Sequence, residues 1–460
     1  MIYNTSDKIH FIGIGGSGMS PIAHYLVDQG YHITGSDQRN SLSTNALESK
    51  GVTIQYGHNN TDLVSQATIV VHSSAIPNSN TELLVAKSNK KNIFRRALLL
   101  NQLFSDATHR IAVAGTHGKT TTSGMISHIL LNSERDPNFI IGSALTSENI
   151  NYRCGNTDFF VIEADESDGS FLDFNATSLV LLNLEEDHMS FFKTKKTLYA
   201  YFKKIIQNTV HFNGTVYINA DDSALMNIIS DIKKSQLLFY GITSDIDIRA
   251  TQIKFHPTGS SFTVTKKGDE LGIITLAVFG NHNIYNALSA ITCLLEHGLS
   301  FDEIKQGLAS FTGTHRRLSC VGTKSDIVVY DDYAHHPTEI KSTLSGLKHC
   351  LNKRLICIFQ PHRHTRLRDF FTRFISSFSD ADIVVITDVY SAGESPIDHI
   401  SAKQLAQEIQ LKHPGQINYV SSLSDIPEML EPELKGGDVI VTMGAGDISK
   451  VAWDIYENTL

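Results

Sequence analysis

Short hydrophobic runs alternate along the chain with stretches whose apolar residues recur every three or four positions, which is typical of strands followed by helices. Residues 8–14 form the first apolar run, and Met19, Ile22 and Leu26 then fall on one face of a predicted helix. A second apolar run ends at Asp37. The same alternation returns at 111–130 and again from 327 onward. It predicts an α/β fold built on parallel sheets.

The length of the chain predicts three parts, since 460 residues suggest about three domains of ~150 residues each. We predict a Rossmann-like domain at 1–107, a central P-loop-type ATPase domain at 108–314 and a second Rossmann-like domain at 315–460. The polar stretch 105–108 is the expected first linker. Within the central domain, short alternating strands over 236–279 predict an added antiparallel sheet.

The clearest chemical signal is a second glycine loop, which lies between the apolar run 111–114 and a helix starting near Lys119. Its residues are Gly115, Thr116, His117, Gly118, Lys119, Thr120 and Thr121. Backbone N–H groups and a helix N-terminus attract phosphate, the lysine adds charge, and a hydroxyl can hold Mg²⁺. The glycines are closer together than in the common P-loop, so the alternative is an ordinary turn with a surface lysine. We interpret the whole context as an ATP-binding loop.

A first glycine loop opens the chain, where Gly13, Gly15 and Gly18 match the Gly-x-Gly-x-x-Gly fingerprint. A diphosphate is expected over Gly15, Gly16, Ser17 and Gly18. Asp37 lies where an acid usually meets a ribose hydroxyl. The fingerprint leaves NAD and other nucleoside diphosphates open. At the end of the run 67–72, the polar residues His72, Ser73 and Ser74 face either the ligand crevice or a loop cap.

Acidic residues follow two further buried runs of the central domain. Glu163 comes after 159–162 and His188 after 179–184. Carboxyl ends of parallel strands share one rim of a sheet, so these side chains are expected beside the second glycine loop. Together with Thr120 or Thr121 they predict a Mg²⁺ site, and solvated loop acids are the alternative.

Later polar clusters are less specific. Two interpretations stay open for the helix that begins near Asn281: either Asn281 and Asn283 cap it, or Asn281, His282 and Asn286 line an adenine or a ribose. Arg363 and Arg366 follow the apolar run 355–359 within one strand-to-helix turn. Arginine at that place suits a carboxylate or phosphate substrate.

The composition of the chain indicates which kinds of binding partner to expect. A net charge of −9 does not favour a nucleic-acid surface, and no stretch approaches the ~18 apolar residues of a membrane span. The five cysteines are scattered and odd in number, which suits a reducing compartment. We therefore expect a soluble cytoplasmic protein with no nucleic-acid or membrane partner.

Taken together, these motifs resemble the Mur ligases over nearly the whole chain. The resemblance rests on the two glycine loops and on the following segments: 163–168, 187–189, 280–287, 315–317, 332–339, 361–366 and 388–394. It implies a three-domain enzyme of peptidoglycan synthesis that works as a monomer or homodimer. The first domain is then expected to hold UDP rather than NAD, and the central domain ATP.

The branch that the chain resembles most joins L-alanine to the lactyl carboxylate of UDP-N-acetylmuramate and yields ADP and phosphate. The resemblance implies that Mg²⁺ is held by Thr120 or Thr121, Glu163 and His188. It places Asn281, His282, Asn286, Arg317 and Tyr333 around ATP. It also places His335, Arg363 and Arg366 near the acyl phosphate and the amino acid, with Lys119 on the transferred phosphate.

Three other functions stay open from the sequence. A sister ligase could attach a recycled peptide to the same sugar nucleotide, although its first glycine loop usually lacks the Gly-Gly-Ser-Gly form found here. A nicotinamide-dependent oxidoreductase would leave Lys119 unexplained. A non-catalytic protein of the same fold would not need Lys119, Glu163 and His188 intact.

Overall fold

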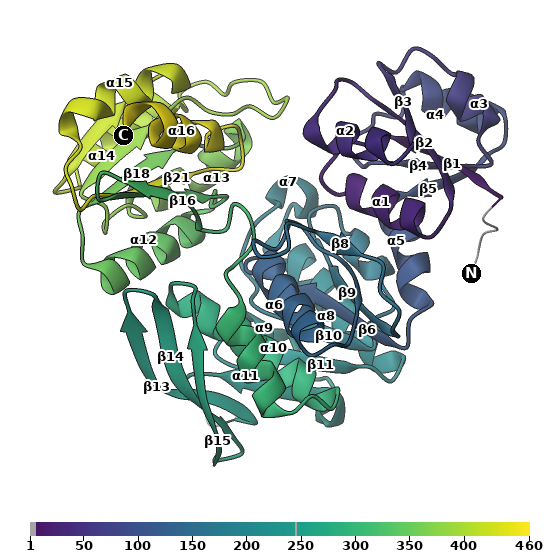
Figure 1. Ribbon diagram of the computed structural model, residues 1–460, viewed down its shortest axis with the longest axis horizontal. Coiled ribbons are helices and arrows are strands. Elements are labelled where there is room, and N and C mark those ends of the chain that lie inside the picture. The colour runs from purple at the N-terminus through teal and green to yellow at the C-terminus, as the bar shows by residue number, and fades with distance from the viewer. Residues whose placement is uncertain (1–5, 244–245) are drawn as a thin grey trace. The chain divides into compact units, whose positions relative to one another are not determined.

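The computed structural model describes residues 6–243 and 246–460, and these form three sheets with helices packed on them (Figure 1). The chain divides into two compact units. The first comprises the described residues of Met1–Arg249, Thr265–Leu271 and Tyr285–Leu308, and the second those of Ala250–Val264, Gly272–Ile284 and Ala309–Leu460. The expected α/β class is confirmed, with one sheet in each of the three predicted domains. The predicted boundaries at 107/108 and 314/315 stay predictions.

The first sheet has five parallel strands in the order β3-β2-β1-β4-β5. Its strands are β1 (Lys8–Ile12), β2 (His32–Asp37), β3 (Thr53–Tyr56), β4 (Ile69–His72) and β5 (Asn92–Arg95). The helices are α1 (Ser20–Asp28), α2 (Leu42–Ser49), α3 (Asp62–Gln66), α4 (Thr81–Ser88) and α5 (Arg96–Ser105). The strand order reverses between β1 and β4, and ligands of such sheets bind outside the carboxyl ends at that point.

The central sheet has the order β15-β14-β13-β12-β11-β10-β6-β9-β7-β8. Its strands up to β12 are β6 (His109–Ala114), β7 (Asn138–Ile140), β8 (Tyr152–Arg153), β9 (Phe159–Glu163), β10 (Ser178–Leu181), β11 (Thr215–Asn219) and β12 (Leu237–Gly241). The helices are α6 (Lys119–Asn132), α7 (Met189–Phe192), α8 (Lys195–His211) and α9 (Ser223–Ile228). Because β6 lies between β10 and β9, residues that follow these three strands share one rim.

The predicted antiparallel stretch begins later than expected. β12 pairs parallel with β11, because the connection from Ala220 to Gln236 contains α9 and is long enough for a crossover. Two-residue connections then join β13 (Ile248–His256), β14 (Gly259–Lys266) and β15 (Asp269–Leu276), and connections this short make neighbouring strands antiparallel. The expectation of an antiparallel addition therefore holds for 248–276 and was wrong for β12.

The third sheet has the order β16-β17-β21-β18-β19-β20, with only the edge pair β16–β17 antiparallel among its described pairings. The strands are β16 (Ser319–Lys324), β17 (Ile327–Asp332), β18 (Leu355–Phe359), β19 (Ile383–Ile386), β20 (Gln416–Tyr419) and β21 (Val439–Met443). The preceding and covering helices are α10 (Asn281–Glu296), α11 (Phe301–Ser310), α12 (Pro337–Leu351), α13 (His364–Ile375), α14 (Ala402–Gln410), α15 (Ile426–Leu430) and α16 (Ser449–Asp454).

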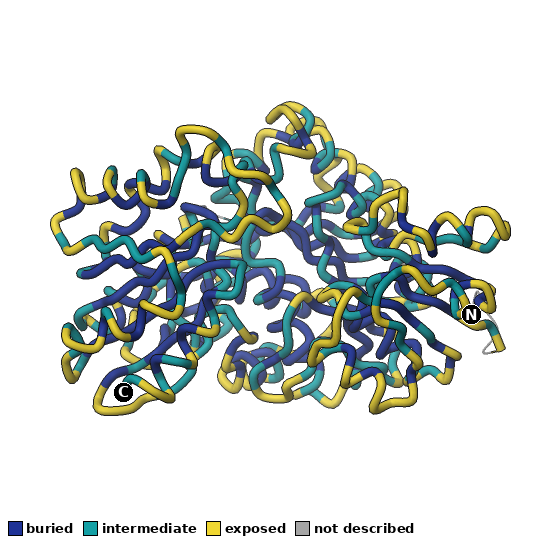
Figure 2. Tube along the Cα trace, turned by 90° about the horizontal axis from the view of Figure 1, so that it is seen from above, coloured by how far each residue is buried: buried dark blue, intermediate teal, exposed yellow. Residues whose placement is uncertain are grey.

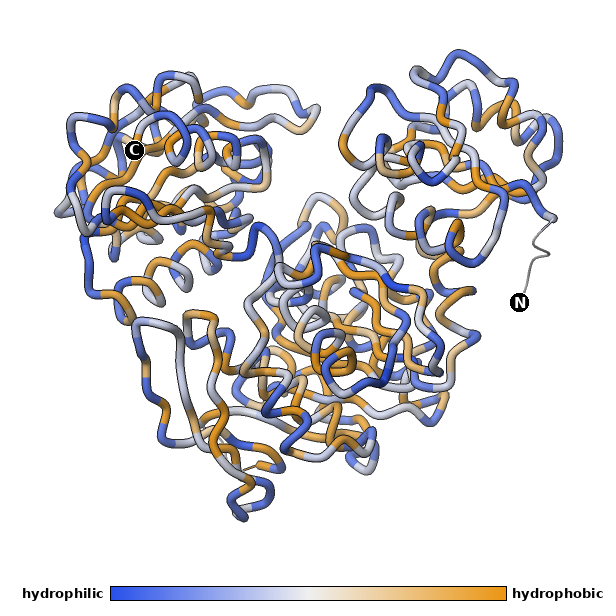
Figure 3. Tube along the Cα trace, in the orientation of Figure 1, coloured by the Kyte–Doolittle hydropathy of each residue, from blue (hydrophilic) through white to orange (hydrophobic). Residues whose placement is uncertain are grey.

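The central strands of the sheets are buried because helices cover their apolar side chains. The strands β18 and β21 are buried at every residue. Figure 2 shows buried segments in dark blue inside exposed loops in yellow, and Figure 3 shows hydrophobic segments in orange inside hydrophilic ones in blue. Burial of such strands supplies the main stabilising free energy of an α/β domain, about 25 cal/mol per Å² of apolar surface. Among the described residues, no helix is long and apolar enough to cross a membrane.

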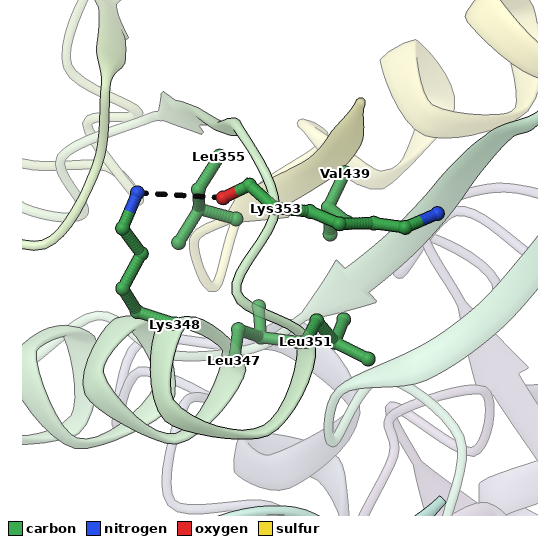
Figure 4. A pocket seen from close by; sticks show the side chains of 6 residues that line it. All are labelled: Leu347, Lys348, Leu351, Lys353, Leu355 and Val439. Carbon is green, nitrogen blue, oxygen red and sulfur yellow. Dashed lines mark hydrogen bonds between the residues drawn. The ribbon is translucent and has the colours of Figure 1, made fainter. Parts of the chain in front are cut away.

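A small hollow lies between α12 and the strands β18 and β21 (Figure 4). Its lining is mostly leucine and valine side chains, and the Lys348 ammonium donates a hydrogen bond of 3.3 Å to the carbonyl of Lys353 beside it. The hollow therefore offers no set of groups for chemistry.

Candidate functional site

The second glycine loop leaves β6 at Ala114 and enters α6 at Lys119. Gly118 has φ +87°, and a Cβ atom there would lie 2.6 Å from the side-chain oxygen of Asn286. Only glycine fits this position without strain or displacement. The structure thus brings Asn286 against the loop, as the nucleotide-binding interpretation requires.

The Lys119 ammonium is held on three sides. It donates hydrogen bonds of 2.7 and 3.1 Å to the carbonyls of Gly115 and Thr116, and it lies 2.8 Å from Oε2 of Glu166. Burial would lower the pKa of Lys119, but Glu166, Asp165 and Glu163 outweigh it and hold that pKa above its ordinary value. The side chain is therefore charged and aimed back over the loop.

The loop is anchored to the segment after β10 through Asn183 and Glu185. Asn183 accepts from the N–H of His117 at 2.8 Å and donates to its carbonyl at 3.0 Å. The Thr116 hydroxyl accepts from the N–H of Glu185 at 2.9 Å. The Glu185 carboxylate also lies 3.1 Å from Nε2 of His117. Sequence reasoning missed both anchors, since an acid and an amide after a strand carry no mark of which loop they will meet.

The predicted metal ligands Thr120 and Glu163 meet directly. The Thr120 hydroxyl donates to Oε2 of Glu163 at 2.8 Å, and the backbone N–H of Gly142 donates to the same oxygen at 3.1 Å. A Cβ atom at Gly142 would collide with that carboxylate and with the Thr120 hydroxyl, so the position forms a cradle that glycine keeps open. In the described part of the chain no such bond joins Thr121 to Glu163.

His188 lies on the same rim, beside a second acidic group. Its Nε2 is 3.9 Å from Glu166 and 3.7 Å from Asp187, and its backbone has φ +53°. Glu166 is 1% exposed, and neither of its oxygens makes a hydrogen bond among the described residues apart from the Lys119 ion pair. Burial raises the pKa of Glu166 to about 7 against the effect of Lys119. Asp165, Glu166 and His188 place three donor atoms within 4.8 Å of one another.

The first glycine loop is hydrogen-bonded to the last two residues of β2, Ser36 and Asp37. The N–H groups of Gly13 and Ile14 donate to the carbonyl of Ser36 at 2.8 and 3.0 Å, and the N–H of Gly15 donates to Asp37 at 2.8 Å. Asp37 therefore uses one oxygen to hold the loop, which the sequence did not predict.

The other residues assigned to the first loop have distinct surroundings. Gly16 and Ser17 are exposed at the loop tip, as is Ser74, while Ser73 comes close to Gly13. His72 lies 3.1 Å from the Ser73 carbonyl through Nδ1, and burial lowers its pKa.

One arginine at the first loop was missed by sequence reasoning. Arg96 begins α5, yet its guanidinium packs over Gly18, where a Cβ atom would lie 2.9 Å from Nη1. The positive charge of Arg96 also acts on Asp165: together with Lys119 it helps to lower the pKa of the Asp165 carboxyl. The only available signal was its place directly after the edge strand β5, on the rim that carries the glycines.

Predicted site residues of the second unit form two groups. In the first, Arg316 and Arg317 lie 4.9 and 5.2 Å from the ring centre of Tyr333, and Arg317 is 3.8 Å from Glu339. His335 lies 3.6 Å from Glu339 as well. The ring of Tyr333 thus makes cation–π contacts with both arginines. The sequence had placed Tyr333 near adenine and did not predict these contacts.

The second group lies at the start of α13. Arg366 is 3.1 Å from Nδ1 of His362, and Arg363 has φ +69° and lies 3.9 Å from Glu394. Glu394 also accepts from the N–H and hydroxyl of Thr365 at 3.0 and 2.8 Å, which fixes the beginning of the helix. The predicted pairing of two arginines in one strand-to-helix turn is thus found.

The helix that opens at Asn281 has mixed roles. Asn283 donates to the carbonyl of Phe279 at 2.7 Å, which ties it to the chain before the helix and differs from a cap, where the side chain accepts from a backbone N–H. Asn281 is exposed and His282 partly buried, with the imidazole of His282 close to Gly280.

Comparisons with known proteins cover the whole chain. Family models match residues 8–108 (Mur ligase family, catalytic domain), 113–294 (Mur ligase middle domain) and 316–446 (Mur ligase, glutamate ligase domain). The UDP-N-acetylmuramate–L-alanine ligase of Geotalea daltonii is 39% identical over 456 residues, covering 99% of each chain.

Solved structures agree with these matches. A UDP-N-acetylmuramate–alanine ligase from Thermotoga maritima matches with a TM-score of 0.83 and 27% identity, covering 98% of both chains. A murein peptide ligase from Psychrobacter arcticus, at 26% identity and the same coverage, has a TM-score of 0.71.

Proposed function

The chain belongs to the Mur ligase family, and we propose that it catalyses the ATP-dependent joining of L-alanine to UDP-N-acetylmuramate in peptidoglycan synthesis. The observation that carries the proposal is the full-length match to ligases of this name in a chain whose phosphate loop is complete. Lys119 is charged and aimed over that loop, and Thr120 meets Glu163 beside it. The murein peptide ligase has the lower TM-score of the two structures, which favours alanine over a recycled peptide.

The reaction needs activation because a carboxylate has no good leaving group. Attack of a lactyl carboxylate oxygen on the γ-phosphorus of ATP breaks the bond to ADP and forms an acyl phosphate. The amine of alanine then attacks the acyl carbon, phosphate leaves, and the amine loses a proton. Phosphoryl transfer depends mostly on positioning and charge neutralisation, and Lys119 supplies both for the β- and γ-phosphates.

A Mg²⁺ ion fits the residues beside Lys119. Carboxylate and hydroxyl oxygens are the donors that Mg²⁺ prefers, and the Thr120–Glu163 pair in the Gly142 cradle offers both. His188 lies on the same rim and would complete the set. When bound, the ion would neutralise phosphate charge. Thr120 is a better candidate than Thr121, because its hydroxyl already faces Glu163.

The two nucleotides divide between the two glycine loops. UDP suits the first loop, where N–H groups and the N-terminus of α1 would meet the diphosphate. Asp37 would then hold the loop rather than only a ribose hydroxyl. Arg96 adds a guanidinium over Gly18, and one guanidinium group can donate two parallel hydrogen bonds to two oxygens of a phosphate.

The second unit would supply groups for the amino acid and for part of ATP. Arg363 and Arg366 carry the positive charge that the alanine carboxylate or an acyl phosphate requires, and His335 lies in the same unit. Arg317 and Tyr333 remain our candidates for contact with the adenine nucleotide. Asn281 and His282 keep the same proposed role at the adenine nucleotide.

The setting of the enzyme follows from its co-substrate. We place the reaction in the cytoplasm, where ATP is available and where the free thiols of all five cysteines would stay reduced. Whether the enzyme is a monomer or a homodimer stays a prediction.

The decisive experiment is ADP formation by the full chain with UDP-N-acetylmuramate, ATP and Mg²⁺, with amino acids added one at a time. We expect turnover with L-alanine and little with an L-alanyl tripeptide. Preference for the tripeptide would assign the sister activity. Tight NADH binding without UDP binding would assign an oxidoreductase instead.

A further inference from the structure

A buried polar cluster lies under the first glycine loop, and the proposed chemistry does not use it. Its members are His10 of β1, Ser36 of β2, His58 after β3 and Glu82 in the first turn of α4. We call it the Glu82 cluster. His10, Ser36 and Glu82 are 0% exposed, so no solvent reaches the carboxylate.

Glu82 receives three contacts at once. Its Oε1 lies 3.1 Å from Nε2 of His10, while Oε2 accepts from the Ser36 hydroxyl at 2.7 Å and lies 2.7 Å from Nδ1 of His58. An ionised carboxylate only accepts, so each imidazole nitrogen that faces it carries the proton. The carboxylate therefore joins the start of α4 to the strands β1 and β2 and to the loop after β3.

Such a cluster is costly if stability is its only purpose. Burial by itself would raise the pKa of Glu82, but bonds from His10, Ser36 and His58 outweigh it and hold the pKa below its ordinary value. The group is thus a compensated buried anion. Well-packed apolar side chains often stabilise a core as well as a buried charged network does.

The cluster is one bond away from the first glycine loop. The carbonyl of Ser36 accepts from the N–H groups of Gly13 and Ile14, and the next residue, Asp37, accepts from Gly15. Ser36 and Asp37 together therefore hold three consecutive N–H groups at the start of the loop. Whatever fixes Ser36 also fixes the direction of the loop.

We propose that Glu82 is a positioning residue for the sugar nucleotide: through Ser36 it holds the first glycine loop in the shape that binds the diphosphate. The inference rests on the proposed function, since it takes the diphosphate to lie on this loop. Small displacements of a binding group are expensive, and a shift of about 1 Å can cost about 100-fold in rate or affinity.

The test compares Glu82→Ala, Ser36→Ala, the double variant and Glu82→Gln. The measured quantities are the KM values for UDP-N-acetylmuramate and ATP, kcat, and the Kd of UDP by calorimetry. We expect each single alanine variant to raise the UDP-sugar KM and the UDP Kd about tenfold or more, with the ATP KM within about twofold. The double variant should be no worse than either single one, because both changes break the same link.

The glutamine variant tests the geometry. Its oxygen can accept from Ser36, and its amide can donate to Nε2 of His10 if that imidazole instead carries its proton on Nδ1, which lies 2.9 Å from the Thr34 hydroxyl. We therefore expect Glu82→Gln to bind UDP within about threefold of the unchanged protein, at neutral pH.

Asn80→Ala is the matched control. Asn80 caps the same helix end by accepting from the N–H of Leu83 at 3.1 Å, and no hydrogen bond joins it to Ser36 among the residues that the structure describes. It should lower thermal stability and leave the UDP Kd unchanged. If Asn80→Ala and Glu82→Ala weaken UDP equally, or if neither alanine variant of the cluster weakens it, the positioning role is wrong.

If Glu82→Ala fails to fold, Ser36→Ala and Glu82→Gln still test the positioning role. A further outcome separates this inference from the proposed function. Should the unchanged protein bind UDP but form no ADP with the two substrates, the proposed function fails while the UDP Kd values of the variants still test the role of Glu82.

Discussion

The Thr120 hydroxyl donates a hydrogen bond of 2.8 Å to Oε2 of Glu163, joining the start of α6 to the end of β9. The N–H of Gly142 donates to the same oxygen at 3.1 Å. Two neighbouring strands and a helix thus bring one carboxylate and one hydroxyl to a single point beside Lys119. That point is where we place Mg²⁺.

Replacing Glu163 by glutamine should selectively weaken the binding of Mg²⁺. The amide can still accept from Thr120, but it removes the negative charge that attracts the cation. We expect the Mg²⁺ concentration for half-maximal ADP formation to rise about tenfold or more. Glu148→Gln, which changes an acid paired with His128 at 3.2 Å, is the control and should leave the Mg²⁺ curve unchanged. Superimposable curves for Glu163→Gln and the unchanged protein would remove Glu163 from the metal site.

Lys119→Ala should abolish ligation and spare the first loop. The loss of a buried cation aimed over the phosphate loop is expected to lower kcat about 100-fold or more. UDP binding by calorimetry should stay within about twofold, because no described contact joins Lys119 to the first loop. Lys195→Ala is a matched control, since Lys195 is an exposed lysine paired with Glu186. Near-normal turnover of Lys119→Ala would exclude the loop from the chemistry.

Gly118→Ala separates backbone strain from a steric clash. An alanine at φ +87° is strained by about 1–2 kcal/mol, and its Cβ would in addition lie 2.6 Å from Asn286. Gly298 has φ +82° and nothing within 4 Å of a Cβ atom, so Gly298→Ala carries the strain alone. We expect both variants to lower the Tm, and only Gly118→Ala to raise the ATP KM. Equal ATP KM values in the two variants would contradict the contact with Asn286.

Asp37→Ala should act on the sugar nucleotide. The change frees the N–H of Gly15, which Asp37 now holds at 2.8 Å, so the UDP-sugar KM should rise about tenfold and the ATP KM much less. Steady-state kinetics with each substrate varied in turn provides the measurement. A larger effect on ATP than on the UDP-sugar would reverse the assignment of the two loops.

Asp332→Asn should change how stability depends on pH. Burial raises the pKa of Asp332 to about 6 from the ordinary value of 3.8, against the effects of Thr343 and Arg317. The folded chain thus binds this proton more tightly than the unfolded chain, so the contribution to stability is complete below about pH 4 and is lost as the pH rises through about 6. Above that pH the charged carboxylate disfavours folding by about 2–3 kcal/mol.

The asparagine keeps the acceptor for the N–H of Ala334 and can pair with the Thr343 hydroxyl. Urea unfolding at pH 8 should therefore show the variant to be more stable than the unchanged protein, with the difference shrinking toward pH 4. Asp326→Asn, at an exposed carboxylate of the same unit, is the control. A constant difference across this pH range would contradict the assignment to Asp332.

Much of the site was predictable because its signals are local in the chain. The glycines, Lys119 and the apolar run before them lie close together in the chain, within residues 111–121, so their spacing alone indicates a phosphate loop. The positions of Glu163 at the end of β9 and of His188 in the loop after β10 were predictable in the same way, since neighbouring strands of a parallel sheet share a rim. The one wrong pairing, β12, followed from a crossover whose helix α9 is too short to give a clear period.

Local patterns in the chain were enough to predict the fold class, both glycine loops and the charged candidate residues, because each of these depends on neighbours a few positions apart. Other contacts could be seen only in the folded protein: Glu166 faces Lys119, Arg96 covers Gly18, and Glu82 joins His10, Ser36 and His58. These partners are far apart in the chain, and folding alone sets which of them meet. Their meeting depends on strand order and register, which bring distant side chains within a few ångströms and which no local pattern records.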